Sequence, residues 1–470
     1  MKMLIHGEWV DREEKINVVD PYDGRVIDTV PSGTAKDVKA AIDSAEEGFR
    51  INRDLPVHKR IEILKGTANI LDERQEEFAR TIATEGSKTI KEARKEAFRA
   101  AQTMTVAAEE ARRILGETIP FDSMAGSENR VGYYYRFPIG IIAAITPFND
   151  PLNLVAHKLG PAIAGGNSVV LKPATVTPLS ALKLGEALLE AGLPPKVLNI
   201  VTGYGSKIGD AMVTDKRVRM ITFTGGTEAG EEIVRKAGLK KIGMELGSNS
   251  PVVVAEDADL ELAVESSVSG AFWAVGQNCI GVQRIYIHEA IYDRFESMFV
   301  ERTKKMKVGR QLDEDTDMGP MITEGEAARV EAWVREAVEK SATLLTGGTR
   351  EGTVFQPTVL SNVPEGVTIA CEEVFGPAVC LFKVKDMDEA VAKANDVRFG
   401  LHAGVFTKDI KTAFKLIKEI DVGGIMINDS SDYRIDLMPF GGVKYSGLGR
   451  EGLKFALLEM TEPKVVCFNL

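Results

Sequence analysis

The sequence predicts an α/β protein in which a doubly wound parallel sheet is joined to a second α/β lobe. From residue 139 onward, short apolar runs alternate with helical stretches, which is typical of parallel strands covered by helices. The run at 139–146 is apolar almost throughout and predicts a strand buried on both faces. The chain has 470 residues, whereas a single core stops growing at ~250–300, so we expect two or more lobes.

The composition disfavours several classes of function. A net charge of -11 opposes binding to nucleic acid or to an anionic membrane. The four cysteines include no CxxC pair, so we expect free thiols in a reducing compartment. We find no apolar run of signal-peptide length at the N-terminus and none near the ~20 residues of a membrane span. We therefore expect a cytoplasmic protein, and the five scattered histidines predict no metal site.

The first part of the chain combines short strands with a charged helical layer. Residues 1–35 indicate strands and turns, with a turn signal at 20–24. In residues 58–80 and 86–115, apolar side chains recur at helical spacing among many charged ones, which predicts helices with one solvated side. We expect these helices to cover a sheet and to contribute little chemistry.

Residues 129–137 alternate in character and contain Tyr133, Tyr134 and Tyr135 in a row. The pattern predicts a strand that forms one arm of a projecting hairpin. At least one of the rings would be exposed in an isolated strand, and exposed aromatic surface often marks a protein contact. An ordinary edge strand remains the alternative.

The predicted first sheet follows this segment. We expect its strands at residues 139–146, 168–172, 197–201, 220–223, 242–246 and 252–254, and its helices at 152–164, 178–191, 205–213 and 227–237. With right-handed crossovers, this alternation predicts a Rossmann-like doubly wound sheet. Sheets of this type bind ligands at the carboxyl ends of their strands.

The remaining residues repeat the alternation less regularly and predict the second lobe. We expect helices at 258–276, 289–306, 323–340, 386–397 and 409–419, and strands at 284–287, 378–382 and 424–427. No long linker separates the lobes, so we expect a cleft between two lobes in firm contact. The predicted domains are residues 1–118 with 138–246, residues 247–446, and a small β element of residues 119–137 with 447–470.

Cys279 is the only cysteine in a polar, glycine-rich loop, at residues 275–281. A reactive thiol must be accessible, because burial among apolar groups raises its pKa. Cys371, Cys380 and Cys467 have apolar neighbours and suit the role of small core residues. An isolated cysteine most often has that role too, so Cys279 needs partners before it becomes a candidate nucleophile.

Candidate partners follow the predicted strands of the first sheet. Asn149 offers an amide that could stabilise an oxyanion, and Glu245 offers a carboxylate that could act as a general base. Lys172 could contact ribose hydroxyls or a phosphate. The segment 223–230 ends a strand and begins a helix, and its glycines would let an anion approach the free N–H groups. Each of these groups alone is also explained by an ordinary strand end or turn.

Their combination and order closely resemble the aldehyde dehydrogenase superfamily, over essentially the whole chain. The matching segments are residues 146–149, 172–174, 223–225, 245–247, 276–279, 373–377 and 439–447. The resemblance implies a Rossmann-like cofactor domain, a second α/β catalytic domain and a small β oligomerisation element. It also implies NAD(P)-dependent oxidation of an aldehyde to the carboxylic acid through a thiohemiacetal and a thioester.

The resemblance assigns roles to individual residues. Cys279 matches the nucleophile, Glu245 the general base, Asn149 the oxyanion donor together with the Cys279 N–H, and Lys158 a proton-relay lysine. Lys172 matches a contact to the adenine ribose, and Glu373 and Phe375 match contacts to the nicotinamide ribose. The full cofactor set comprises Thr146, Pro147, Phe148, Lys172, Ala174, Thr175, Gly205, Gly209, Phe223, Thr224, Gly225, Gly226, Leu246, Glu373 and Phe375.

The sequence departs from many NAD-preferring members of that family at Thr175, where they carry a glutamate that binds the adenine ribose. A carboxylate would repel a 2′-phosphate, and Thr175 does not. We therefore expect NADP to be accepted as well as NAD, and a preference for NADP stays open. The alternative is that Thr175 reflects sequence drift and has no bearing on the cofactor. Ser248 replaces a glycine of the family pattern, and we expect this change to be tolerated.

The candidate substrate residues are His157, Asn278 and Arg434. The loop 428–434 is similar to that of family members acting on lactaldehyde, glyceraldehyde, its phosphate and small phosphonate- or sulfonate-bearing aldehydes. Arg434 and His157 could hold a hydroxyl or an anionic tail, because arginine suits carboxylate and phosphate. The alternative is that Arg434 forms a structural ion pair with Asp432 or Asp436.

Two other functions remain open from the sequence. One is an acylating enzyme that passes the thioester to coenzyme A, which the retention of Glu245 disfavours. The other is a non-catalytic structural relative, which the complete set of site residues disfavours. The resemblance also implies pairing through the hairpin and a C-terminal strand at 463–468, so we expect a homodimer or homotetramer, with a small-molecule aldehyde as the other partner.

Overall fold

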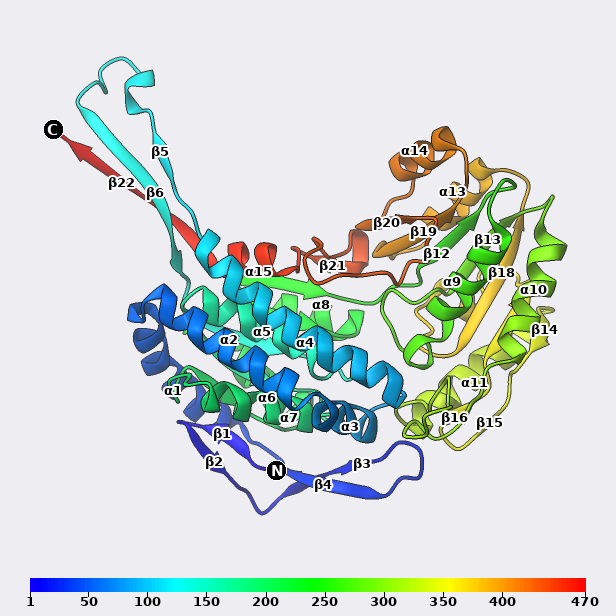
Figure 1. Ribbon diagram of the computed structural model, residues 1–470, viewed down its shortest axis with the longest axis horizontal. Coiled ribbons are helices and arrows are strands. Elements are labelled where there is room, and N and C mark those ends of the chain that lie inside the picture. Colours follow the sequence, from blue (N-terminus) through cyan, green and yellow to red (C-terminus); the bar gives the residue numbers. More distant parts are fainter.

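The computed structural model describes all residues, 1–470, and divides them among two large sheets and a projecting three-stranded sheet (Figure 1). The eight-stranded sheet has the order β2-β1-β9-β8-β7-β10-β11-β21. Its strands are β1 (Met3–Ile5), β2 (Glu8–Val10), β7 (Ile141–Ile145), β8 (Ser168–Lys172), β9 (Leu198–Ile200), β10 (Val218–Thr224), β11 (Lys241–Glu245) and β21 (Gly447–Leu448). The strands β7 to β11 run parallel, whereas β1, β2 and β21 join the edges antiparallel.

Helices cover both faces of this sheet. They are α1 (Ala35–Asp54), α2 (Val57–Glu73), α3 (Gln75–Glu85), α4 (Ile90–Glu110), α5 (Asn153–Ala164), α6 (Leu179–Glu190), α7 (Gly205–Thr214), α8 (Thr227–Ala237) and α15 (Leu453–Glu459). Alternate residues of β7 enter different cores: Ile142 and Ala144 join a cluster of 47 buried residues, and Ile141 and Ala143 join one of 20. The predicted burial of the strand at 139–146 on both faces is confirmed for β7.

The charged helical region differs in detail from its prediction. The expected helix at 58–80 is two helices, α2 and α3, which meet at Arg74. Helix α4 begins four residues later than predicted because Thr89 and Glu92 form a capping box that starts it at Ile90. Before α1, the short strands β3 (Lys15–Val19) and β4 (Val26–Pro31) form a separate ribbon.

The second large sheet has seven strands in the order β14-β17-β18-β13-β12-β19-β20. They are β12 (Pro251–Val254), β13 (Arg284–His288), β14 (Thr343–Thr346), β17 (Thr358–Ser361), β18 (Ala378–Val384), β19 (His402–Phe406) and β20 (Gly424–Ile427). All pairs are parallel except β14 with β17. The strand predicted at 252–254 as part of the first sheet is therefore corrected: it is β12, which lies between β13 and β19.

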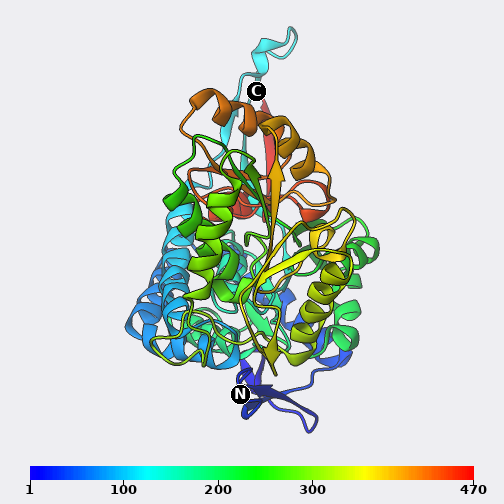
Figure 2. The same ribbon diagram turned by 90° about the vertical axis from the view of Figure 1, so that its right-hand side faces the viewer.

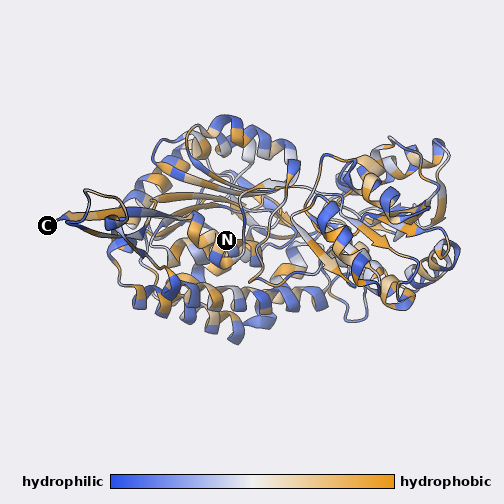
Figure 3. Cartoon of the chain, turned by 90° about the horizontal axis from the view of Figure 1, so that it is seen from above, coloured by the Kyte–Doolittle hydropathy of each residue, from blue (hydrophilic) through white to orange (hydrophobic).

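Helices also cover the second sheet, and a minor ribbon extends it. The helices are α9 (Leu260–Phe272), α10 (Tyr292–Lys304), α11 (Glu324–Glu339), α12 (Thr368–Cys371), α13 (Met387–Asn395) and α14 (Ile410–Glu419), and the ribbon is β15 (Arg350–Glu351) with β16 (Val354–Phe355). In each lobe, apolar strands lie between helices whose outer surfaces are hydrophilic (Figure 3). No helix is both long enough and apolar enough to cross a membrane.

The third sheet projects from the first lobe, at the opposite end of the molecule from the N-terminal strands (Figures 1 and 2). It consists of β5 (Glu117–Ile119), β6 (Arg130–Pro138) and β22 (Thr461–Asn469), all antiparallel. The predicted small element differs at one end, because β21 pairs with β11 and α15 packs on α5. Residues 447–460 therefore lie with the first lobe, and the other predicted domain limits stay predictions.

Candidate active site

A cavity of about 1250 Å³ lies at the carboxyl edge of the first sheet and extends to the second lobe. Cys279, Glu245 and Asn149 all line it. So does every residue of the predicted cofactor set: Thr146, Pro147, Phe148, Lys172, Ala174, Thr175, Gly205, Gly209, Phe223, Thr224, Gly225, Gly226, Leu246, Glu373 and Phe375. Lys158, His157, Asn278 and Arg434 do not line this cavity.

Strand register explains why residues distant in sequence meet at this cavity. Ile145 of β7 pairs with Lys172 of β8 on one side and with Phe223 of β10 on the other. Thr224, the next residue of β10, pairs with Glu245 of β11. Parallel strands in register end at a common edge, so the polar residues at their ends share one rim.

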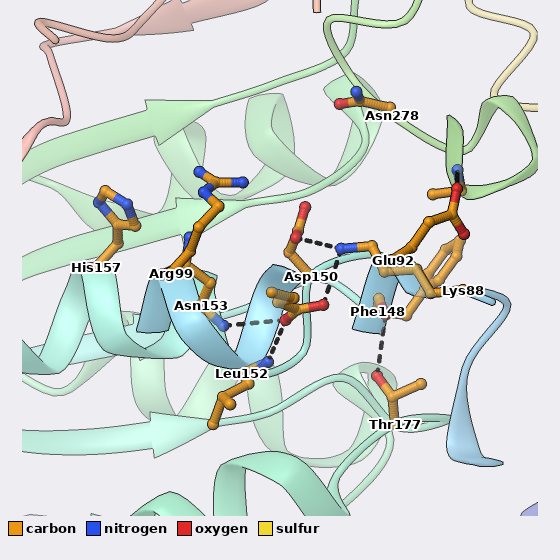
Figure 4. A network of polar contacts seen from close by, with 12 residues as sticks. Lys88, Glu92, Arg99, Phe148, Asp150, Leu152, Asn153, His157, Thr177 and Asn278 are labelled. Carbon is orange, nitrogen blue, oxygen red and sulfur yellow. Dashed lines mark hydrogen bonds and ion pairs between the residues drawn. The ribbon is translucent and has the colours of Figure 1, made fainter. Parts of the chain in front are cut away.

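The loop before Cys279 has an unusual backbone. Ala274 and Val275 adopt φ values of 49° and 62°, a region that β-branched residues rarely enter, and Gly276 follows at 67°. A side chain at Gly276 is excluded, because its Cβ would lie 2.3 Å from the Gly376 carbonyl oxygen. The loop is tied at Ala274, whose N–H donates 2.9 Å to Glu92 of α4 (Figure 4).

The side chain of Gln277 provides a second tie, because its Oε1 accepts a hydrogen bond of 3.0 Å from the Ile322 N–H. Strained backbone persists where surrounding contacts determine it, and such positions cluster at active sites. The contacts of Glu92 and Gln277 therefore hold Cys279 in a loop conformation that this segment would not adopt alone.

The Cys279 side chain is half-buried at the cavity wall. Desolvation raises the pKa of its thiol, and the carboxylates of Glu373, Glu245 and Asp150 raise it further, whereas Arg434 lowers it. The thiol therefore ionises less readily than that of an exposed cysteine.

Glu245 is a buried carboxylate that lines the same cavity. Burial raises its pKa well above the ordinary value, and Glu451 adds to this, whereas Arg434, Lys158 and Arg450 oppose it. Its Oε2 atom has no hydrogen-bond partner in the protein. A carboxylate with a raised pKa and an unpartnered oxygen beside a cavity is suited to proton transfer near neutral pH.

Lys158 lies behind Glu245 rather than in the cavity. Its amine donates 2.8 Å to Glu451 Oε1 and 3.0 Å to the hydroxyl of Thr222. Although burial acts in the opposite direction, Lys158, His157 and Arg434 lower the pKa of Glu451 to about 2. Sequence reasoning missed Glu451, although it closely follows the matching segment 439–447, because no local pattern shows that it meets Lys158.

His157 and Arg434 have partners that the sequence did not predict. His157 Nε2 lies 2.8 Å from Asp436 Oδ1, which also accepts 2.8 Å from Arg99. The alternative that Arg434 pairs with Asp432 or Asp436 is wrong, because its nearest carboxylate is Glu451, at 3.7 Å.

The guanidinium of Arg434 is buried and incompletely bonded. It stacks 3.6 Å from the centre of the Phe440 ring, and its Nε and Nη2 atoms have no hydrogen-bond partner in the protein. Buried donors without partners are uncommon, and their presence here is expected of a site that takes a ligand with acceptor atoms. Asn278, on the Cys279 loop, faces Asp150 and Arg99 from across the site (Figure 4).

The part of the cavity around Lys172, Thr175 and the start of α8 fits a dinucleotide. Lys172 is buried with only the Pro173 carbonyl as acceptor, and desolvation lowers its pKa to about 8, so no carboxylate offsets its charge. Helix α8 begins after Gly226 without a side-chain cap, which leaves its first N–H groups for an anion. The Thr175 hydroxyl donates 3.2 Å to the Gly203 carbonyl, so no acid repels a phosphate from that residue.

Another part of the same cavity is lined by Glu373 and by the rings of Phe148 and Phe375. The Ser248 N–H donates 2.8 Å to Glu373, whose pKa is raised to about 7 by burial. Gly247 leaves room for this carboxylate, since a Cβ there would lie 2.5 Å from Glu373 Oε2. Phe148 and Phe375 meet edge to face at 5.6 Å and border the same region.

Comparisons with known proteins agree with this geometry. The sequence model that describes the aldehyde dehydrogenase family matches residues 9–466 of this chain. The chain is 50% identical over 458 residues to aspartate-semialdehyde dehydrogenase 1 of Pseudomonas canavaninivorans, covering 97% of each. It is 48% identical over 468 residues to 3-sulfolactaldehyde dehydrogenase of Priestia megaterium, covering 100% of this chain and 98% of the relative.

Among solved structures, the fold matches glyceraldehyde-3-phosphate dehydrogenase GapN from Methanocaldococcus jannaschii complexed with NADP. The TM-score is 0.95 at 40% identity, and the match covers 98% of this chain and 100% of the other. The predicted fold class is thus confirmed.

Proposed function

The chain belongs to the aldehyde dehydrogenase family, and we propose that it oxidises a small aldehyde to the carboxylic acid with NADP or NAD. The observation that carries this proposal is that Cys279, Glu245 and Asn149 line one cavity together with a region that fits a dinucleotide. Hydrolysis of a thioester needs a base beside the nucleophile, and we assign Glu245 to that task.

The chemistry assigns one step to each of the three residues. The Cys279 thiol loses its proton to water, its sulfur adds to the aldehyde carbon, and the amide of Asn149 donates to the oxyanion that forms. Bound NADP or NAD supplies the acceptor for the hydride. Cys279 then holds the acyl group as a thioester, and Glu245 takes a proton from the water that releases the acid.

Two buried charged residues, Lys158 and Glu451, provide a route by which Glu245 releases its proton. Lys158 and Glu451 form a 2.8 Å ion pair, in which Glu451 raises the pKa of Glu245 and Lys158 lowers it. We assign Lys158 to this relay rather than to substrate contact, because its side chain is 1% exposed and its amine is bonded to Glu451 and Thr222.

The substrate that suits the site is small, either similar to lactaldehyde or glyceraldehyde or bearing a short anionic tail. Support comes from the unpartnered, buried guanidinium of Arg434, whose charge lowers the pKa of Cys279. The relatives named for 3-sulfolactaldehyde and glyceraldehyde 3-phosphate act on aldehydes of this kind. His157 supports the site through Asp436, and Asn278 borders the substrate from the Cys279 loop.

The test is a panel of initial rates for lactaldehyde, glyceraldehyde, its 3-phosphate and succinic semialdehyde, each with NAD and with NADP. We expect reduced cofactor to form with at least one aldehyde and none to form in Cys279→Ala. A further comparison with Arg434→Ala should lower kcat/KM for anionic aldehydes more than for neutral ones. Equal losses would remove the assignment of Arg434, and no turnover of any aldehyde would remove the proposed function.

The acylating alternative is tested in the same assay. If the product forms without coenzyme A and is the free acid, the thioester is hydrolysed, as the position of Glu245 suggests. A strict requirement for coenzyme A would favour the acylating enzyme instead. A non-catalytic relative would leave the cofactor unreduced throughout.

The projecting sheet suits assembly of a homodimer or homotetramer. Tyr133, Tyr135, Val465 and Phe468 are exposed on it, so its apolar side chains lack a covering layer within the chain. Two strands, β6 and β22, pair over nine positions and give this sheet a stable frame. We place the protein in the cytoplasm, and light scattering of the purified protein would give its assembly state.

A further inference from the structure

Asp150 lies next to the residues that line the cavity, although it is not one of them, and none of the steps above assigns it a role. It follows Asn149 directly, in the turn before α5, and its side chain is 20% exposed. The Lys88 amine is bonded to its Oδ1 atom, and Lys88 is itself nearly fully buried (Figure 4). Asp150 is therefore held in place by a residue of the outer helical layer.

The turn that carries Asp150 is fixed from below. Lys88 also donates 2.8 Å to Glu96 Oε2, and Glu96 Oε1 accepts the N–H groups of Leu152 and Asn153 at 2.9 and 3.0 Å. Glu96 thereby caps the start of α5. Because the turn and Oδ1 are both held by hydrogen bonds, the position of the second oxygen, Oδ2, is fixed as well.

The Oδ2 atom of Asp150 accepts no hydrogen bond from the protein, because Lys88 binds Oδ1 alone. The side chain points toward Asn278 on the Cys279 loop (Figure 4). Its charge also contributes to the raised pKa of the Cys279 thiol, so the carboxylate lies within electrostatic range of the sulfur. Asp150 thus presents a fixed acceptor with one free oxygen that points toward the Cys279 loop.

The charge around Asp150 indicates which kind of donor fits. Although burial acts to lower it, Asp150 and Glu96 raise the pKa of Lys88, so this lysine stays cationic and neutralises the carboxylate. The Arg99 guanidinium adds a further positive charge nearby (Figure 4). A cationic ligand group gains little at a neutralised carboxylate, whereas a hydroxyl gains a hydrogen bond.

We propose that Asp150 Oδ2 accepts a hydrogen bond from a hydroxyl on carbon 2 of the aldehyde, so that 2-hydroxyaldehydes are the favoured substrate class. This rests on the proposed function. The Asn149 amide donates a hydrogen bond to the carbonyl oxygen. Asp150 is the next residue in the chain, with its Cα ~3.8 Å away, and it accepts a hydrogen bond from the hydroxyl on the neighbouring carbon. Asp150 is then a specificity-determining residue.

The test compares lactaldehyde with propanal, which differ only in the 2-hydroxyl group. In the wild-type protein kcat/KM should be about tenfold or more higher for lactaldehyde, since the unpaired acceptor disfavours the analogue without the hydroxyl. Asp150→Ala should reduce that ratio to near one, chiefly through lactaldehyde. Asp150→Asn keeps an acceptor oxygen and should give an intermediate ratio.

Glu96→Gln is the matched control, because it disturbs the same turn without removing Oδ2. It should lower kcat/KM for both aldehydes by the same factor and leave their ratio unchanged. Equal losses for both aldehydes in Asp150→Ala would mean that Asp150 only holds the turn, which overturns the proposal. A ratio near one in the wild-type protein would overturn it too.

A binding measurement separates this proposal from the proposed function. Calorimetry with lactate and propionate should show tighter binding of lactate to the wild-type protein and equal binding to Asp150→Ala. That pattern without turnover of any aldehyde would remove the enzymatic function but keep the hydroxyl subsite. If Asp150→Ala instead lowers the rate with aspartate semialdehyde and not with succinic semialdehyde or lactaldehyde, the group recognised is an ammonium and the proposal is wrong.

Discussion

The Ala274 N–H donates a hydrogen bond of 2.9 Å to Glu92, and this contact ties the nucleophile loop to helix α4 of the other lobe. The second carboxylate oxygen of Glu92 accepts 2.8 Å from the Thr89 N–H and caps the same helix. Burial raises the pKa of Glu92, whereas Ala274, Thr89 and Lys88 oppose that rise. One side chain therefore serves both the start of a helix and the conformation of the loop that carries Cys279.

Replacing Glu92 with Ala should lower stability by roughly 2 kcal/mol, because a helix cap is lost and a buried N–H is left unpaired. The urea midpoint should fall and kcat should fall with it, while cofactor affinity changes little. Glu301→Ala, at an exposed position of α10, is the control and should stay within ~0.5 kcal/mol of wild type. An unchanged kcat in Glu92→Ala would show that the loop holds its shape without this contact.

Glu245→Gln should stop the reaction after formation of the thioester. Because the amide cannot take a proton from water, we expect one equivalent of reduced cofactor per site in a burst and then very slow turnover. Rapid-mixing absorbance measures the burst, and mass spectrometry of the trapped protein should show the acyl group on Cys279. Continued steady turnover would assign the base to another residue.

The raised pKa of Glu245 predicts a pH dependence. A carboxyl group acts as a base only when ionised, and burial keeps Glu245 protonated to higher pH than an ordinary glutamate. The rate of acid release should therefore still rise with pH above the range in which an ordinary glutamate titrates, and this rise should be absent in Glu245→Gln. A rate that is flat from pH 5 to 8 contradicts the assignment.

Asn149→Ala should lower kcat/KM by about 10²–10³, since removal of one oxyanion donor typically costs that much. NADP binding, followed by fluorescence, should be unaffected, because we assign the amide to the aldehyde and not to the cofactor. A loss of cofactor affinity equal to the loss of activity would place Asn149 in the cofactor site instead.

Lys172 should make NADP affinity depend on pH. Its pKa is lowered to about 8 by desolvation, so its amine is cationic at pH 7 and largely neutral at pH 9. The Kd for NADP should rise over this range and the Kd for NAD should rise less, since only NADP carries the 2′-phosphate. Lys172→Arg keeps its charge throughout and should lose this dependence; the same slope in that variant would exclude Lys172 as its source.

The strand-end residues could be predicted from the sequence because parallel strands end at one edge. Apolar runs located the strands, and Lys172, Phe223 and Glu245 came together once their register was set. Cys279 could be singled out because its loop is polar and rich in glycine. The strands β14, β17 and β19 were missed, since they are short and, as in β19 with His402 and Gly404, interrupted by residues that strands do not favour.

The partners of the buried side chains depended on the tertiary structure. His157 meets Asp436, and Lys158 meets Glu451, across separations of 279 and 293 residues. Local spacing carries no information about such pairs, because helix α5 and the C-terminal segment meet only when the chain has packed. The sequence by itself thus determined which groups the chemistry uses and the sheet edge that collects them. Packing between distant segments decided the pKa shifts of these groups. It also left two nitrogens of Arg434 and one oxygen of Asp150 without hydrogen-bond partners. Desolvation and hydrogen-bond partners exist only in the folded protein.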